Sequence, residues 1–167
     1  MYPGRHAVEH PEQPAIVMAG SGIRVSYGEL DRRANRMAHL LRAQGLQRLD
    51  HYAVFMENHP RYAEICSAGE RTGLYYTCIN SFLTAEELAY ILDNCRARLL
   101  ITSAARLDVA RQALALCPRI ERCLVLDAPG LQEGREQDYE AALAAHPDTP
   151  LAHERLVNLL HEYLVER

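Results

Sequence analysis

The sequence contains no lysine, because all eighteen of its basic residues are arginines. It also lacks internal repeats, low-complexity stretches and any apolar run of about 18 residues, the length that a membrane-spanning helix needs. The chain does not open with a charged segment followed by an apolar one, as a secretory signal does. We therefore expect a cytoplasmic protein with no transmembrane segment.

A strong charge of one sign is absent as well. The formal net charge is −4, which gives no electrostatic reason to bind nucleic acid or an anionic membrane. Arg32, Arg33 and Arg36 lie close together on a predicted helix, and we expect them to form a solvated face.

The cysteines do not suggest a disulfide framework. Their number is odd, no two have C-x-x-C spacing, and most fall within or beside apolar stretches. The simplest expectation is a set of buried free thiols in a reducing compartment. The five residues are Cys66, Cys78, Cys95, Cys117 and Cys123.

The remaining composition is that of an ordinary globular domain. The chain has 167 residues, of which 49% are hydrophobic and 24% charged, so it can bury a core without disulfides or metals. Apolar runs at 52–56, 74–79, 98–101 and 122–126 predict strands that are buried on both faces. Amphipathic stretches at about 61–72, 84–94 and 104–116 separate these runs and predict crossover helices. The fold class that follows is α/β, with a mostly parallel sheet and helices on both faces.

The flanking segments are predicted from turn and cap residues. Apolar runs at 14–18 and 23–27 surround a glycine turn and predict a short N-terminal hairpin. Ser26 with Glu29, and Thr84 with Glu87, have the spacing of a capping box, and Gly73 is a natural helix stop. The stretch 127–136 is expected to be a loop, 139–145 a short helix, and 152–167 an amphipathic C-terminal helix.

Several blocks of the sequence resemble the adenylate-forming, AMP-binding family, and in particular its acyl-CoA synthetase (fatty-acid-CoA ligase) branch. The similarity covers about residues 2 to 150 and corresponds to the N-terminal subdomain of that family. The motifs that carry it mark helix starts, helix stops and strand beginnings, and they need no catalytic explanation. They are Ser26-Tyr27-Gly28-Glu29-Leu30, Met56 to Tyr62 (MENHPRY), Glu70 to Thr77 (ERTGLYYT), and Asn80 with Leu83 to Ile91 (LTAEELAYI).

The resemblance implies an activity for the complete family member. Such enzymes join ATP and a carboxylic acid into an acyl-adenylate, and CoA then displaces AMP. ATP, Mg and CoA are the cofactors implied for the full-length family. The ATP phosphates are held by a Ser/Thr/Gly-rich loop that ends in lysine, because backbone N–H groups and a cation are needed there.

That loop is not found in this sequence. Residues 154–167, where the family would place it, contain no Gly, Ser, Thr or Lys. We therefore expect residues 1–150 to form the N-terminal subdomain and 151–167 an added amphipathic helix, in a truncated chain that is inactive alone. We expect no catalytic, cofactor-binding or metal-binding residue and no cofactor bound by this chain by itself.

Two departures from the family pattern suggest relaxed constraint. Leu49 stands where the family usually has glycine, and a side chain there is expected to strain the turn. Gly69 lies inside a predicted helix where the related pattern favours alanine, at a cost of about 1 kcal/mol.

The histidines and tyrosines leave alternatives open. His6 and His10 are four residues apart, but Pro3 and Pro11 predict an irregular segment, and four converging metal ligands are not evident. His59, after Glu57 at the end of a predicted strand, is either half of an acid–base pair or a loop histidine that helps a helix to start.

Tyr75 and Tyr76 are expected in a buried strand, where they either pack in the core or face an acyl channel. The expected partners are the remainder of a synthetase or a second copy of the chain. A fatty acid is expected only in a complete enzyme, and nucleic acid is not expected. The alternative function is a non-catalytic α/β binding or assembly module that pairs with another chain.

Overall fold

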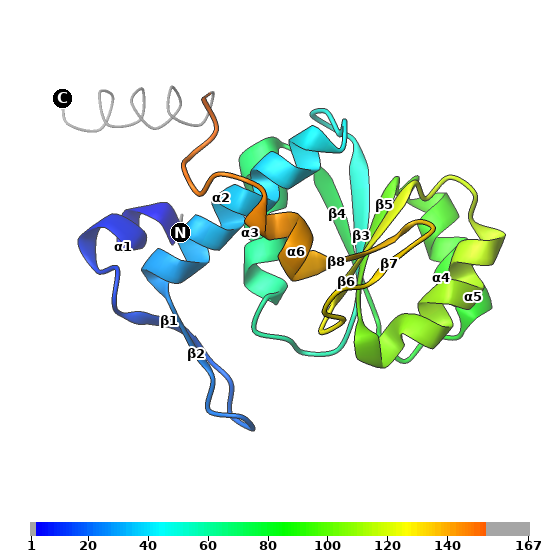
Figure 1. Ribbon diagram of the computed structural model, residues 1–167, viewed down its shortest axis with the longest axis horizontal. Helices are drawn as coiled ribbons and strands as arrows, with labels where there is room; N and C mark the ends of the chain where they lie inside the picture. Colours follow the sequence, from blue (N-terminus) through cyan, green and yellow to red (C-terminus); the bar gives the residue numbers. More distant parts are fainter. Residues whose placement is uncertain (1–2, 153–167) are drawn as a thin grey trace.

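The computed structural model describes residues 3–152. The predicted helix at 152–167 therefore lies outside the described residues apart from its first position. The described chain is a three-layer α/β domain, with a small hairpin that projects from one side (Figure 1). Within residues 3–152, no helix is both long and apolar enough to cross a membrane.

The elements follow one another in the alternating order predicted for a parallel sheet. The helices are α1 (Pro3–Glu9), α2 (Tyr27–Ala43), α3 (Tyr62–Thr72), α4 (Ala85–Asn94), α5 (Leu107–Leu116) and α6 (Tyr139–Ala144). The strands are β1 (Pro14–Val17), β2 (Arg24–Ser26), β3 (His51–Phe55), β4 (Tyr75–Ile79), β5 (Leu99–Ser103), β6 (Arg122–Leu126), β7 (Gln132–Glu133) and β8 (Glu136–Asp138).

The main sheet has six strands in the order β4-β3-β5-β6-β8-β7. Every neighbouring pair is parallel except β7 with β8, which is antiparallel. The central strands are apolar and buried on both faces, as a parallel sheet between helix layers requires. The predicted fold class is confirmed.

Alternate side chains of the central strands supply two cores. Tyr52 and Val54 pack with α2, α3 and α6, whereas Ala53 and Phe55 pack with α4 and α5 on the opposite face. This division follows from the two-residue period of a strand, which sends successive side chains to opposite faces. Figure 1 shows the two helix layers on either side of the sheet.

The stretch 127–136 is not only a loop, as the sequence predicted. It contains β7 and the first residue of β8, and β8 pairs in parallel with β6. Both strands are short and polar, so their residues carry no apolar signal. The exposed β7 forms the sheet edge, whereas β8 lies between β6 and β7 with Glu136 and Asp138 buried.

The N-terminal segment is helical rather than irregular. Pro3 opens α1, because proline is tolerated in the first turn of a helix, where its missing N–H leaves no bond unmade. The hairpin that follows was predicted and is confirmed, with Ile16 opposite Val25 in an antiparallel register.

The caps that begin and end the helices follow the predicted residues with one difference. The Thr84 and Glu87 pair forms a complete capping box at α4, and Gly73 ends α3 with φ 66°. At α2, the Ser26 hydroxyl accepts a bond from the Glu29 N–H, but the Glu29 carboxylate accepts one from Arg61 instead of closing the box.

Gly69 is required by packing. A Cβ atom at this position would lie 2.5 Å from the Tyr52 hydroxyl oxygen and 2.6 Å from Cδ1 of Tyr76. The Tyr52 ring is fully buried, and its hydroxyl donates to the Ile65 carbonyl at 2.6 Å. The prediction that Gly69 reflects relaxed constraint is therefore wrong. Leu49 does have the expected strained backbone, with φ 74°.

The strand β4 is an edge strand and is not buried as predicted. Tyr75 is 55% exposed and Tyr76 half-buried, because no strand of the described chain covers the outer side of β4. The prediction of buried cysteines holds for Cys117 and Cys123 only. Cys78 on β4 is exposed, and the remaining two, Cys66 and Cys95, are partly buried.

Candidate functional site

The loops that follow the parallel strands gather at one edge of the sheet, which we call the carboxyl edge. It is formed by the residues after β3, β4, β5 and β6, at 56–61, 80–84, 104–106 and 127–131. Open α/β sheets bind their ligands at this edge, because strand ends and helix starts meet there. It is therefore the first place to look for a site.

His59 lies at the carboxyl edge and joins two of its loops. Its Nδ1 accepts the backbone N–H of Arg61 at 3.1 Å, and its Nε2 lies 3.2 Å from Oδ2 of Asp127. With Nδ1 accepting, a neutral ring carries its proton on Nε2 and donates it to the carboxylate. The acidic partner is thus Asp127, not the neighbouring Glu57, and the ring helps α3 to start, as the loop-histidine alternative predicted.

Glu57 belongs to a second group at the same edge. Its Oε2 accepts a hydrogen bond from the buried Ser103 hydroxyl at 2.7 Å and lies 3.9 Å from Nε of Arg106. The Arg106 guanidinium in turn lies 5.4 Å from the centre of the Phe82 ring, which is 84% exposed. These contacts connect three loops, and they place a carboxylate and a hydroxyl in contact with each other.

A buried ion-pair network joins α3 to α2 and α6. The Glu64 carboxylate is 0% exposed and accepts bonds from Nε of Arg33 and from the Tyr139 hydroxyl, both at 2.7 Å. Arg33 also bonds Glu140 at 2.7 Å, and Arg61 bonds Glu29 at 2.8 Å. Arg33 therefore does not belong to a solvated face, as the sequence predicted, but ties three helices together.

Burial controls the electrostatics of this network. It raises the pKa of Glu64, while the hydrogen bonds from Arg33 and Tyr139 act in the opposite direction. Burial lowers the pKa of Arg33, but the bonds to Glu64 and Glu140 outweigh it and raise the net value. Burial also raises the pKa of Tyr139, and the neighbouring Glu64 adds to that effect. The network links α2, α3 and α6, and its charged groups are paired with one another.

The helix starts at the carboxyl edge carry acidic side chains. A helix N-terminus attracts phosphate through its free N–H groups and its positive dipole end. All four helices that start at this edge, α3 to α6, carry a carboxylate in the first turn. The backbone N–H of the loop residue Gly130 already donates a hydrogen bond to the Asp138 carboxylate at 2.9 Å. Carboxylates therefore lie at these helix starts together with the arginines Arg61 and Arg106, which pair with nearby carboxylates.

The described residues do not bring together a set of metal ligands. Among residues 3–152, no group of three or more His, Cys, Asp or Glu side chains is placed to hold a metal ion. His6 and His10 come within 6.4 Å of each other, measured between ring centres, and His6 lies 5.1 Å from the Tyr27 ring. The three rings form an aromatic group, and the His6–Tyr27 contact in it joins α1 to α2.

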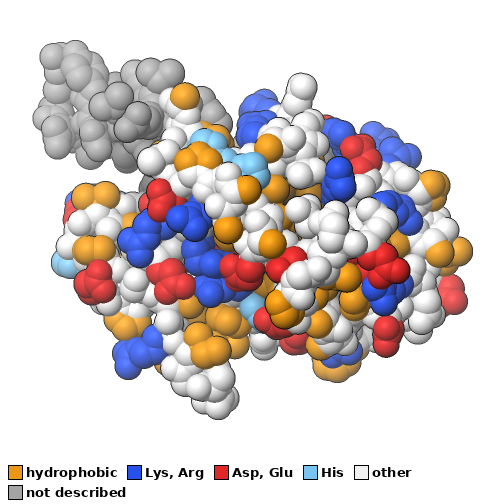
Figure 2. Space-filling view, viewed as in Figure 1, with side chains coloured by type: hydrophobic (Ala, Val, Ile, Leu, Met, Phe, Trp, Pro, Cys, Tyr) orange, Lys and Arg blue, Asp and Glu red, His pale blue; other side chains and the backbone are white. Residues whose placement is uncertain are grey.

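The surface supports the same view of the charges. On the face drawn in Figure 2, basic and acidic side chains are interspersed. Such a face has no patch of one sign for a polyanion.

Sequence reasoning missed the network residues Glu64 and Tyr139 and, separately, the buried Arg71. A usable signal was present, since Glu64 and Arg71 occupy the buried side of α3 together with Ile65 and Ala68. A charged residue on the apolar face of a helix predicts a buried partner. Arg71 meets Asp31 at 2.6 Å, and it also bonds the Asn35 side chain.

Known proteins resemble this chain over most of its length. The profile of the family described as "AMP-binding enzyme" matches residues 4–161. An acetyl-coenzyme A synthetase from Coprinopsis cinerea is 30% identical over 160 residues, which cover 86% of this chain and 24% of that protein. A crotonobetaine/carnitine–CoA ligase from Citrobacter koseri is 37% identical over 89 residues, covering 53% of this chain and 17% of that protein.

A solved structure shows the same fold. The crystal structure of the anthranilate CoA ligase AuaEII in complex with anthranoyl-AMP superposes with a TM-score of 0.81 at 20% sequence identity. The match covers 89% of this chain and 28% of that one. The chain thus spans about a quarter of the length of the Coprinopsis synthetase and of this ligase.

Proposed function

Because the chain belongs to the AMP-binding enzyme family, we propose that it forms the N-terminal subdomain of an ATP-dependent acid–CoA ligase. The complete ligase would convert a carboxylic acid into an acyl-adenylate and then into an acyl-CoA. The observation that carries this proposal is the family match over residues 4–161, on a sheet with the order and parallel pairing described above.

We further propose that these 167 residues do not perform the adenylation alone. Phosphate binding needs a flexible loop rich in backbone N–H groups and a cation. The sequence has no lysine, and the helix starts at the carboxyl edge are acidic. ATP, Mg and CoA would therefore be held by residues outside this sequence, and the chain contributes the scaffold that positions them.

We propose the domain boundary at residue 150, and contacts between α2 and residues 148 and 149 support attachment of the chain as far as this boundary. The Asn35 amide donates to the Asp148 carbonyl at 2.9 Å, and Nε2 of His39 lies 2.9 Å from the Thr149 carbonyl oxygen. Leu151 is buried in the core with α2. The polypeptide is thus attached to the domain up to this point.

The acid is proposed to be a fatty acid, because the motifs at 56–62 and 70–77 are most similar to the acyl-CoA synthetase branch. A relative of this kind is the fatty acid–acyl-carrier-protein ligase ScoC of Streptomyces coeruleorubidus, which is 35% identical over 95 residues that cover 57% of this chain and 18% of that protein. The acid class would be determined by comparing the ATP–pyrophosphate exchange rates of the complete ligase with acetate, medium-chain and long-chain acids.

ATP–pyrophosphate exchange tests the proposal directly. The purified chain should exchange no label with any acid in this series, and a complete ligase of the family serves as the positive control. Isothermal titration with Mg·ATP should show no saturable heat. Clear turnover by the pure chain would refute the inactivity. The DNA beyond codon 167 tests whether the chain is part of a longer ligase. If it is, that DNA should encode a Ser/Thr/Gly-rich loop that ends in lysine.

The alternative is a non-catalytic module that pairs with a separate chain carrying the ATP site. The lack of any lysine that could hold the ATP phosphates in this sequence supports it. Co-expression separates the two: under the alternative, pyrophosphate exchange appears when two separate chains are mixed and in neither chain alone. Under the main proposal, it appears only when both parts are one polypeptide.

A further inference from the structure

Two of the cysteines meet where α3 packs on the edge strand β4. Cys66 lies on α3 and is partly buried, whereas Cys78 lies on β4 and is exposed. The Cys66 thiol makes a side-chain hydrogen bond with Cys78, and the Tyr62 hydroxyl makes another. The two cysteines have no motif spacing in the sequence, so only the fold brings their thiols together.

The topology accounts for this meeting. Helix α3 connects the parallel strands β3 and β4 and therefore runs antiparallel to both. A Cβ atom at Gly69 would lie 2.6 Å from Cδ1 of Tyr76, so these two positions face each other. Cys66 is about one turn before Gly69 on the same face of α3, and Cys78 is two residues after Tyr76 on the same face of β4. Because helix and strand run in opposite directions, both steps lead the same way and place the two cysteines opposite each other.

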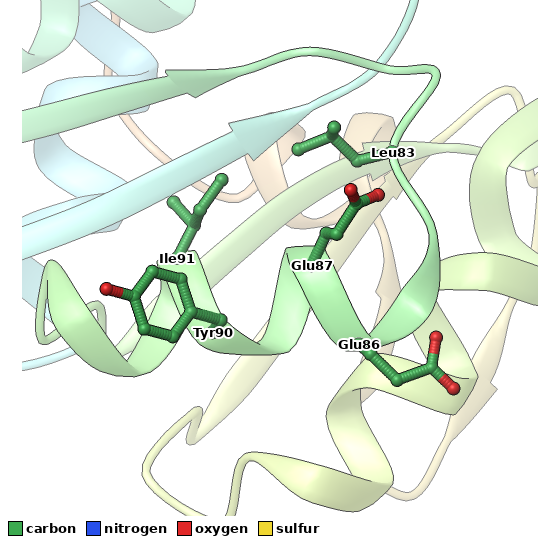
Figure 3. Close-up of a pocket in the computed structure, with 5 residues that line it drawn as sticks. All are labelled: Leu83, Glu86, Glu87, Tyr90 and Ile91. Carbon is green, nitrogen blue, oxygen red and sulfur yellow. The ribbon is translucent and has the colours of Figure 1, made fainter.

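The other three cysteines lie on the opposite face of the sheet. Cys95, Cys117 and Cys123 all pack in the core that contains α4 and α5, whereas Tyr62 and Tyr76 pack against the core on the α3 face. A shallow apolar hollow of about 440 Å³ on the α4 side has no cysteine among its lining residues, which are Leu83, Glu86, Glu87, Tyr90 and Ile91 (Figure 3). Cys66 and Cys78 therefore have each other as their thiol neighbours on the α3 face.

We propose that Cys66 and Cys78 are a redox-sensitive pair that hydrogen peroxide converts into a disulfide joining α3 to β4. The Cys78 thiolate attacks the peroxide, so that an S–O bond forms, the O–O bond breaks and the departing hydroxide takes up a proton to become water. The Cys66 thiolate then attacks the Cys78 sulfur, so that the S–S bond forms, the S–O bond breaks and a second water leaves. The two thiols lose two electrons and two protons in all, and the peroxide is reduced to two waters. A dithiol reductant reverses the change.

Exposure and burial assign the order of the two steps. Cys78 is the exposed member of the pair and is therefore the one that an oxidant in solution reaches. Burial, together with the neighbouring Cys78, raises the pKa of Cys66, so at neutral pH this thiol is a poor target for peroxide. Its attack on an oxidised Cys78 is intramolecular, and proximity compensates for the small thiolate fraction. The inference rests on the fold and does not depend on the proposed ligase role.

Peptide mapping of the full chain after treatment with hydrogen peroxide tests the pairing. The remaining free thiols are first blocked with N-ethylmaleimide, so that no exchange follows. A protease that cuts after glutamate then releases Cys66 in peptide 65–70 and Cys78 in peptide 71–86, with Cys95 on a different peptide. Mass spectrometry without reductant should show the first two peptides joined, with the loss of two hydrogens, and reduction should separate them. Closing the loop between residues 66 and 78 should also raise Tm by about 5–10 °C.

Serine variants separate the roles of the two thiols. Cys78→Ser should give no joined peptide and leave Cys66 reduced, whereas Cys66→Ser should halt at a Cys78 sulfenic acid that dimedone traps. Cys95→Ser, the matched change at a partly buried cysteine on the other face, should form the disulfide at the wild-type rate. The rise in Tm should be absent from both Cys66→Ser and Cys78→Ser. A wild-type chain in which peroxide links Cys78 to any other cysteine or to a second chain, or leaves Cys66 as a free thiol, would overturn the inference, as would an oxidised chain with an unchanged Tm.

Discussion

The substitution Gly69→Ala isolates the packing of a single methyl group inside the domain. Gly69 lies within α3, where alanine is the preferred residue by about 1 kcal/mol, so helix propensity alone predicts stabilisation. The structure predicts the opposite. The new Cβ would lie 2.5 Å from the Tyr52 hydroxyl oxygen, well inside van der Waals contact.

The size of the destabilisation depends on whether Tyr52 and Tyr76 can move away from the new methyl group. Tyr52 is 0% exposed and its hydroxyl is fixed by a 2.6 Å bond to the Ile65 carbonyl, so it cannot swing aside. Tyr76 is half-buried on the edge strand β4 and can move. Overpacking a core costs about 1–3 kcal/mol, and loss of the hydroxyl bond adds about 1. After subtracting about 1 kcal/mol for helix propensity, we expect destabilisation by about 1–3 kcal/mol.

Urea unfolding measures this change as a lower midpoint at constant m-value. In a thermal scan of a chain of this length, the same change lowers Tm by about 2–4 °C for each kcal/mol. Gly20→Ala is the control, because no atom lies within 4 Å of a Cβ there. Its stability should stay near that of the wild type.

A double-mutant cycle with Tyr52→Phe identifies the clash. Removing the hydroxyl leaves Cε1 of the ring, at 3.3 Å, as the nearest Tyr52 atom. Gly69→Ala should then be milder than in the wild type, with a coupling energy of about 0.5–3 kcal/mol. A Gly69→Ala chain as stable as the wild type, or no coupling to Tyr52→Phe, would refute the reasoning.

Three further expectations concern strain, burial and protonation. Leu49→Gly should raise the free energy of unfolding by about 0.5–1 kcal/mol, because φ 74° strains a side chain; an unchanged urea midpoint would contradict this. Glu64→Leu removes the buried partner shared by Nε of Arg33 and the Tyr139 hydroxyl and should destabilise by about 3–5 kcal/mol, whereas Glu140→Gln, at a half-exposed carboxylate, should change the urea-derived free energy by less than about 1; equal effects would exclude burial as the cause. The backbone and side-chain hydrogen bonds of Thr84 lower the pKa of Glu87, so this carboxylate adds stability above its unfolded pKa and loses it as the pH falls through the folded one. An NMR titration should show this depression, reduced but not abolished in Thr84→Val, and no change in that variant would contradict the assignment.

Local chemistry was sufficient to predict the main elements. Capping residues, glycine stops and apolar runs predicted the hairpin, the crossover helices between β3 and β6, and the parallel sheet, because each depends on neighbours in the sequence. The short polar strands β7 and β8 could not be predicted. Their pairing depends on β6 being next to them, and their residues have no apolar period.

The candidate site was less accessible to sequence reasoning. His59 was singled out correctly as a residue at a strand end, but its partner Asp127 lies 68 positions away along the chain. Glu64 and Tyr139 are 75 positions apart and meet only because α3 and α6 pack on the same face of the sheet. Such pairs are set by topology, and no spacing rule reports them.

The sequence by itself determined the α/β class, the family and the lack of a lysine to hold phosphate, because these depend on residue types and local order. Only the tertiary structure decided which residues are buried and which meet. It placed β4 at an open edge, explained Gly69 by the rings of Tyr52 and Tyr76, and turned Arg33 into the centre of a buried network. The physical reason is that burial and ion pairing depend on distances between segments, which the chain fixes only by folding.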